Sequence, residues 1–308
     1  MISGDGTFET GELSAQQAER MAFIHDLKRF AIERLGVREN RSFETYKDTP
    51  SFYALYIASH DALETAHNLG WTHETWHERE PWIERQQELE GSGYDLLPMV
   101  WDAAGDNKCP VSPGMLSAPK EAVSRVVFHE QVHINMMEIS PRRIALPLEE
   151  AAAEAFVYQG MMRYFHNDKD MQEEINRVQK DWTTFLSYGI KYIALLDKAY
   201  AKSTKQGRAL LHQAREEAEE MHAHTYSETV KKRLQMPINN AFFYRLKQYA
   251  PHHQAAFEIL EQYEPAQYMP RLRRLIGFLS EPSDLERFLL PLKESAPSNT
   301  GEIHSVAA

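Results

Sequence analysis

The chain has little that could build a disulfide framework, a membrane span or a nucleic-acid surface. Only one of its 308 residues is cysteine, Cys109, which excludes an intramolecular disulfide and a cysteine-built zinc site. No apolar run approaches the roughly 20 residues needed to cross a bilayer. The 34 basic residues are outnumbered by 45 acidic ones, and the formal charge of −11 repels a phosphate backbone. The sequence therefore predicts a protein with neither a membrane nor a nucleic-acid partner.

An export signal is also missing. The N-terminal stretch "MISGDGTFETGELSAQQ" contains neither a basic region nor an apolar core. Together with the single cysteine, this predicts a cytoplasmic protein. Because 43% of the residues are hydrophobic, the chain can bury a sizeable core. We expect one domain over residues 1–294, followed by a flexible polar tail at 295–308.

Hydropathy patterns predict a mainly α (α+β) fold with a small β-sheet. Helical spacing of apolar residues indicates a helix over Ser14–Leu35 that stops at Gly36. The β-rich stretches "SFYALYIAS" and "YDLLPMVW" indicate two short strands within residues 14–116. Residues 117–294 are expected to be helical. We expect a first helix with Ser117 as its N-cap and longer helices over Leu148–Phe165, Asp170–Ala201 and Gly207–Leu234. Shorter helices are expected after Pro237, Pro251 and Pro265.

The pattern His-Glu-x-x-His occurs twice. The two copies are His73, Glu74 and His77, and His129, Glu130 and His133. On a helix this spacing places both imidazoles on one face, one turn apart, where they can bind a single Zn²⁺ while the glutamate reaches the water on the metal.

The residues around the two patterns favour the second one. Apolar side chains surround it, namely Val126, Val127, Phe128, Val132, Ile134, Met136 and Met137. The first pattern runs into charged residues and Pro81, which ends or kinks a helix. Only the second is followed by a helix with carboxylates to complete a metal site, at Glu149, Glu150 and Glu154. We interpret the first pattern as a coincidental match in a surface segment.

The third ligand comes from the helix that follows. Glu150 and Glu154 share a helix face, so one can bind the metal while the other accepts a hydrogen bond from a liganding histidine. "LPLEEAAAEAF" resembles the Glu-Gly-x-Ala-Glu motif of gluzincin metallopeptidases, although Ala151 replaces the common glycine. The resemblance implies a zincin-like fold in which Glu150 joins His129 and His133 as a zinc ligand and Glu154 supports a histidine. Glu149 remains a competing ligand.

Two further segments, "LKRFAIERLGVRENRSFETYKD" and "INNAFFYRLKQYAPHHQAAFEIL", resemble the predicted aminopeptidase family of bacterial gluzincins. This resemblance implies zinc-dependent peptide hydrolysis with Glu130 as general base. In the second segment, Tyr244 and Tyr249 are the other catalytic candidates, and packed or surface roles are the alternative for each. Asn239 and Asn240 either cap a helix or bind the substrate backbone.

Other functions remain open at this level. The same residues could form a buried polar network without metal, although burying them together is costly without a cation. A catalytically retired metal-binding scaffold is a second alternative, and retention of Glu130 argues against it. A zinc hydrolase of a small non-peptide amide is a third. The sequence does not discriminate exo- from endopeptidase or define the oligomeric state.

Overall fold

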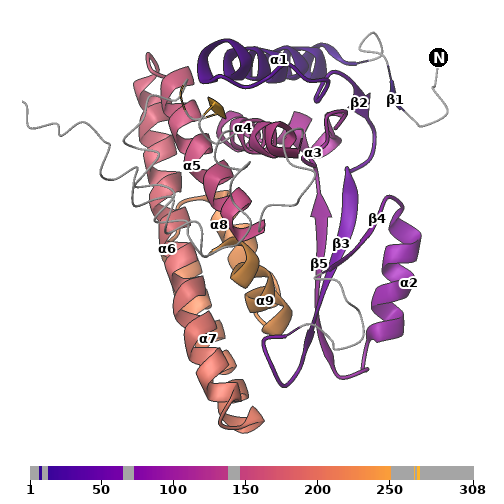
Figure 1. Cartoon of the computed structure of the whole chain (residues 1–308), viewed down its shortest axis with the longest axis vertical. Helices are drawn as coiled ribbons and strands as arrows, with labels where there is room; N and C mark the ends of the chain where they lie inside the picture. Colours follow the sequence, from indigo (N-terminus) through magenta and orange to yellow (C-terminus); the bar gives the residue numbers. More distant parts are fainter. Residues whose placement is uncertain are drawn as a thin grey trace, which may run out of the picture.

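The computed structural model describes residues 13–64, 73–137 and 146–250, with short pieces at 7–8, 267 and 269–270. Most of this part of the chain is helical, and a small antiparallel sheet lies beside the helices (Figure 1). The prediction of a mainly α fold with a small sheet is therefore confirmed. None of the described helices has the length and apolar character needed to span a bilayer.

The strands come from the N-terminal third of the chain, and the helices follow mainly after them. The strands are β1 (Thr7–Phe8), β2 (Tyr46–Lys47), β3 (Phe52–Ser59), β4 (His73–Trp76) and β5 (Tyr94–Trp101). The helices are α1 (Ala15–Leu35), α2 (Arg79–Leu89), α3 (Pro113–Ser117), α4 (Lys120–Met137), α5 (Leu146–Tyr164), α6 (Lys169–Tyr200), α7 (Thr204–His224), α8 (Glu228–Leu234) and α9 (Asn240–Tyr249).

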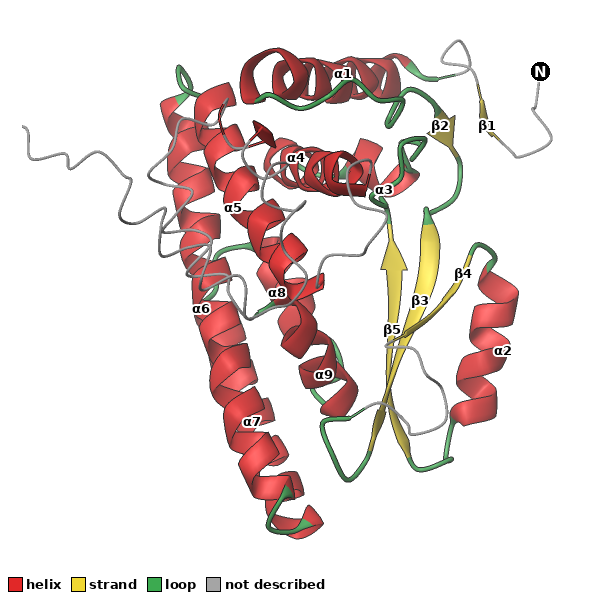
Figure 2. Ribbon diagram, in the orientation of Figure 1, coloured by secondary structure: helices red, strands yellow, loops and turns green. Residues whose placement is uncertain are grey.

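The main sheet has three antiparallel strands in the order β4-β3-β5 (Figure 2). Tyr53 in the central strand pairs with Trp76 on one side and Val100 on the other. Because β3 lies in the middle, both of its edges are paired, and helices cover both of its faces. Its alternate residues Ala54 and Tyr56 pack towards α6 and α9, whereas the opposite face packs towards α2.

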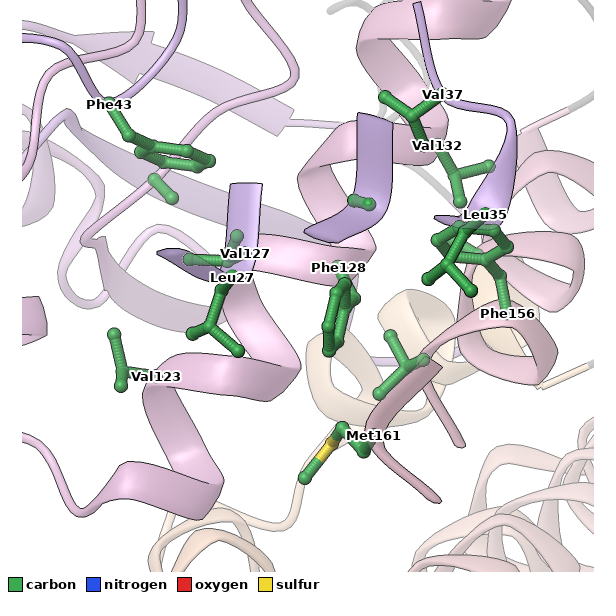
Figure 3. Close-up of a cluster of buried hydrophobic side chains, with 14 of the residues drawn as sticks. Leu27, Leu35, Val37, Phe43, Val123, Val127, Phe128, Val132, Phe156 and Met161 are labelled. Atoms are coloured by element: carbon green, nitrogen blue, oxygen red, sulfur yellow. The ribbon is translucent and has the colours of Figure 1, made fainter. Parts of the chain in front are cut away.

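A separate hydrophobic core joins α1, α4 and α5. Figure 3 shows Phe128 of α4 and Phe156 of α5 in this cluster, together with Leu27 and Leu35 of α1. All four side chains are fully buried, and the two phenylalanine rings meet edge to face. This core holds α4 and α5 against each other, and these helices carry the second His-Glu-x-x-His pattern and the glutamates that follow it.

The helix over Ser14–Leu35 is confirmed, with Ser14 as N-cap and Gly36 at a left-handed φ of 73° as C-cap. The two strand predictions are confirmed by β3 and β5, and the helix over Asp170–Ala201 by α6. Helix α5 covers most of the predicted helix Leu148–Phe165.

Two boundary predictions were wrong. Ser117 does not cap the helix of the second pattern, because it is the last residue of α3 and its hydroxyl donates to the Gly114 carbonyl. The helix predicted over Gly207–Leu234 is divided into α7 and α8. At the break, the Asp181 carboxylate accepts hydrogen bonds from the backbone N–H groups of Tyr226 and Ser227, and Ser227 caps α8. Most of the turn "SPRRIALP" lies outside the described residues, and so do most of the segments expected to be helical after Pro251 and Pro265. The tail at 295–308 lies outside them entirely.

Candidate metal centre

Helices α4 and α5 bring together three side chains that could hold a metal ion. His129 and His133 lie one turn apart on α4, and Glu150 faces them from α5. Alanines surround this glutamate on α5, and their short side chains allow the two helices to pack closely. The buried ones are Ala151, Ala152, Ala153 and Ala155.

The spacing of the three side chains suits a small metal ion. The Nε2 atoms of His129 and His133 are 3.0 Å apart. Oε2 of Glu150 lies 3.2 Å from the first of these nitrogens, and Oε1 lies 3.5 Å from the second. Ligands around a tetrahedral zinc ion, with bonds of about 2.0–2.1 Å, are about 3.3 Å from one another. Within the described residues this is the one group of histidine, cysteine and carboxylate side chains with such spacing.

The other ring nitrogens of both histidines face carboxylates. Nδ1 of His133 lies 2.7 Å from Oε1 of Glu149, and Nδ1 of His129 lies 3.3 Å from Oε1 of Glu154. A carboxylate at this position accepts a hydrogen bond from Nδ1–H, so the neutral ring keeps its proton on Nδ1 and carries its lone pair on Nε2. Glu149, expected as a competing ligand, thus lies on the outer side of His133, and Glu154 has the corresponding position beside His129.

This arrangement concentrates electron-rich atoms at one point. If both rings are neutral, two bare Nε2 atoms and the Glu150 carboxylate face each other, which is unfavourable in a buried site without a cation. Burial opposes charge on both histidines, yet the carboxylates outweigh it: Glu150 and Glu154 raise the pKa of His129 well above its usual value, and Glu150 and Glu149 raise the pKa of His133. Burial also opposes charge on Glu150, but the imidazoles lower its pKa. The site thus requires positive charge, which protons or a metal ion can supply.

Arg125 extends this chain of charges by one more turn of α4. Its guanidinium forms an ion pair with Oε2 of Glu154, and both side chains are nearly buried. The other face of the guanidinium lies over the ring of Trp182, 4.5 Å from its centroid. Arg125 belongs to no motif in the sequence, although its position four residues before His129 places it on the same helix face.

Glu130, between the two histidines in the sequence, lines a pocket of about 300 Å³ together with His129 and Glu150. Its side chain is 7% exposed. Burial raises the pKa of Glu130, although the neighbouring His129 and His133 favour its charged form. A carboxylate with a raised pKa beside a metal site can accept a proton and return it near neutral pH.

The loop between β5 and α3 passes close to the site, and Gly105 makes this approach feasible. A Cβ atom added at Gly105 would lie 2.5 Å from Cβ of His133 and 3.6 Å from Oε2 of Glu130. Such a short carbon–carbon distance requires a shift of the loop or the histidine. The sequence carries no motif that distinguishes this glycine.

The first His-Glu-x-x-His pattern is not on a helix. His73 and Glu74 belong to strand β4, where residues four apart are separated by about 13 Å along the chain. His73 stacks on Tyr56, with the ring centroids 4.8 Å apart, and Glu74 accepts hydrogen bonds from Arg85. The interpretation of this pattern as coincidental agrees with these contacts.

The remaining candidates from the sequence lie on α9. Tyr244 packs against the core between the sheet and α6, and it is not among the described residues that line the pocket. The side chain of Tyr249 lies outside the described part. Asn239 caps α9, which is one of the two roles considered for it from the sequence. The amide of Asn240 donates to the carbonyls of Ser59 and His60, so it joins α9 to the sheet.

Comparisons with known proteins identify a family. Neither a curated protein nor a solved structure matches the chain. A family model described as "Putative aminopeptidase" matches residues 101–287, a range that includes all the described helices from α3 to α9. Because the match covers more than half of the 308 residues, the chain belongs to this aminopeptidase family.

Proposed function

We propose that the protein is a zinc-dependent peptidase in which His129, His133 and Glu150 hold the metal. One observation carries the proposal: in both imidazoles Nδ1 faces a carboxylate, of Glu149 or Glu154, and Nε2 faces the carboxylate of Glu150. Neutral imidazole and carboxylate are the ligands that zinc takes in catalytic sites without cysteine. Glu149 and Glu154 then fix the ring orientation of His133 and His129.

Glu130 is the proposed general base. A zinc ion at this site would lower the pKa of a water molecule and polarise the carbonyl of the bond to be cleaved. Glu130 takes the proton of the attacking water and passes it to the leaving amine, a contribution of about 10²–10⁴ in rate. The retention of a buried carboxylate beside the ligands favours this role over a structural metal site, which needs no base.

The strand next to the site supports a peptide as the substrate. In the described sheet, β5 is an edge strand, and Met99, Val100 and Trp101 line the same pocket as His129. Val100 is 51% exposed. An edge strand presents backbone N–H and C=O groups with which an extended peptide can pair.

Asp102 is the proposed partner of the substrate amino group. It follows β5 directly, lines the pocket, and accepts a hydrogen bond from the Ser112 hydroxyl. The other carboxylates among the described lining residues belong to the metal group or its partners. A carboxylate here would bind a free α-ammonium group, in agreement with the family name.

Metal analysis combined with peptide cleavage tests the proposal. Purified wild-type protein should contain about one zinc per chain, kept by Glu130→Gln and lost by His129→Ala, and both variants should lose turnover. His73→Ala is the matched histidine control and should keep metal and activity. A chelator should stop cleavage of a mixed peptide library by the wild type, and N-acetylation should protect the cleaved peptides. Loss of metal in His73→Ala with retention in His129→Ala would reject the site, and a zinc-loaded protein that cleaves no peptide would reject the activity.

A further inference from the structure

Cationic side chains line the pocket beside the candidate metal site. Besides Arg125, they are Lys232 and Arg233 of α8 and Arg245 of α9. Apolar side chains of α6, including Phe185 and Leu186, also line the pocket. The pocket therefore combines the candidate metal ligands with cationic groups that attract anions.

Aromatic rings hold two of these cations in place. The guanidinium of Arg233 lies over Trp182, 5.3 Å from the ring centroid, and Arg245 lies 5.4 Å from the centroid of Trp101. Both rings belong to residues that line the pocket. Stacking restricts the long side chains but leaves the planar guanidinium able to donate N–H groups in its own plane. Such a donor fork matches the two oxygens of a carboxylate.

The lining of the pocket is less acidic than the chain as a whole. The protein has a formal charge of −11, whereas Lys232, Arg233 and Arg245 join Arg125 among the residues that line the pocket. Arg245 is 4% exposed, so water screens its attraction for an anion only weakly. Apart from Asp102, the acidic lining residues are Glu130, Glu150 and Glu154, which lie beside the two histidines or Arg125.

We infer that Lys232, Arg233 and Arg245 bind a carboxylate of the substrate, so that the enzyme selects short peptides bearing a negative charge near the scissile bond. The inference rests on the proposed peptidase function. A carboxylate is the anion that peptides carry, either at the C-terminus or on an acidic side chain. A pocket of about 300 Å³ is at the lower end of ligand-site volumes, roughly 300–1,000 Å³, which suits a short substrate.

Three variants separate this role from general effects on α8. Arg233→Gln removes the charge and keeps a polar side chain of moderate length. Lys232→Gln is the second variant, because Lys232 is exposed and its replacement should not disturb folding. Lys231→Gln is the matched control: Lys231 is on the same helix, pairs with Glu228 at 2.7 Å, and does not line the pocket.

Binding and turnover are measured with three peptides on the zinc-loaded full chain. The peptides are tri-alanine, its C-terminal amide, and alanyl-alanyl-glutamate α-amide, whose only carboxylate is on the side chain. Calorimetry in the Glu130→Gln background measures binding without cleavage, and the wild-type background measures kcat and KM. Circular dichroism checks the fold of each variant.

Tri-alanine should bind at least about 10-fold more tightly than its amide, as expected for a charge-assisted contact. Arg233→Gln and Lys232→Gln should reduce this preference and raise KM with little change in kcat, whereas Lys231→Gln should preserve it. If the glutamate peptide binds as tightly as tri-alanine, a side-chain carboxylate is sufficient for recognition. If it binds only as tightly as the tri-alanine amide, the C-terminal carboxylate is the one recognised. Either result supports carboxylate recognition.

The inference would be overturned by equal affinity for tri-alanine and its amide, or by no measurable binding of tri-alanine. It would also be overturned if Lys231→Gln reduced the preference for tri-alanine as much as Arg233→Gln and Lys232→Gln do. These results are distinct from failure of the proposed function. If tri-alanine binds with the expected preference but the wild type does not cleave it, carboxylate recognition stands and the peptidase proposal fails. If the wild type cleaves tri-alanine and its amide with the same kcat/KM, the peptidase proposal stands and the inference fails.

Discussion

The Nδ1 atom of His133 lies 2.7 Å from Oε1 of Glu149, on the side of the imidazole ring that faces away from Glu150. Two adjacent glutamates of α5 therefore contact the same histidine through its two different nitrogens. In our proposal Glu150 is a ligand and Glu149 orients the ring, and this difference makes their replacements distinguishable.

We predict that Glu150→Gln removes most bound zinc, whereas Glu149→Gln weakens zinc binding by about 10- to 100-fold. Loss of a ligand removes a bond to the metal, but loss of the Nδ1 partner only weakens the orientation and basicity of His133. Competition with a chelator of known affinity measures both effects. Glu84→Gln, an exposed glutamate on α2, is the control. If Glu149→Gln loses the metal and Glu150→Gln keeps it, the two roles are exchanged.

Arg125 is expected to contribute to stability as well as to the site. Because its ion pair with Glu154 is nearly buried, Arg125→Met leaves a carboxylate without its partner and should destabilise the protein by about 3–5 kcal/mol. Urea unfolding in the presence of a chelator measures this effect without a contribution from metal binding.

The double variant Arg125→Met with Glu154→Gln should recover part of the lost stability, because it removes the carboxylate charge that the guanidinium compensated. If the two single variants are additive in the double variant, the ion pair makes no specific contribution.

Gly105→Ala should damage the site through contact with His133. The added Cβ would lie 2.5 Å from Cβ of His133, so either the loop or the imidazole must move. We expect weaker zinc binding and a fall in kcat/KM of about 10-fold or more, because small displacements of catalytic groups are costly. Helix content measured by circular dichroism should be unchanged.

Gly91→Asn is the control, since nothing lies within 4 Å of a Cβ there and asparagine tolerates a φ of +77°. Full activity of Gly105→Ala would show that the loop can move without affecting the site.

Zinc binding at neutral pH should release protons. Burial disfavours the charged form of His129, but Glu150 and Glu154 hold its pKa well above the usual value, and the pKa of His133 is also raised. The metal-free site therefore holds protons more readily than free histidines do, most of all at His129, and zinc must displace them, so zinc affinity should fall as the pH falls. Calorimetry in buffers with different ionisation enthalpies measures the number of protons released.

The folding stability of the metal-free protein should have the opposite pH dependence to zinc affinity. A pKa that is higher in the folded state stabilises the metal-free protein fully below the unfolded histidine pKa of about 6.5, and this stabilisation is lost as the pH rises through the raised value. His73→Ala should release the same number of protons as the wild type, because burial and the nearby Arg245 lower the pKa of His73. Zinc binding at pH 7 without proton release would contradict the prediction.

Local patterns predicted the elements of the fold where capping and periodicity agree. Ser14 and Gly36 mark the ends of α1, and the β-rich stretches become β3 and β5. The division between α7 and α8 was not predictable in this way. It depends on the Asp181 carboxylate, which is more than 40 residues away in the sequence and caps the break through space.

The sequence by itself determined the chemical types and the helical spacing of the groups at the candidate site. His129 and His133, and likewise Glu150 and Glu154, are one turn apart because four residues make about one helical turn. Tertiary structure alone decided which side of each imidazole meets which carboxylate, since that depends on how α4 and α5 rotate and approach around their shared core. It also brought Arg125, Gly105 and the cationic residues of α8 and α9 to the pocket, because contacts between distant segments follow from packing and not from local periodicity.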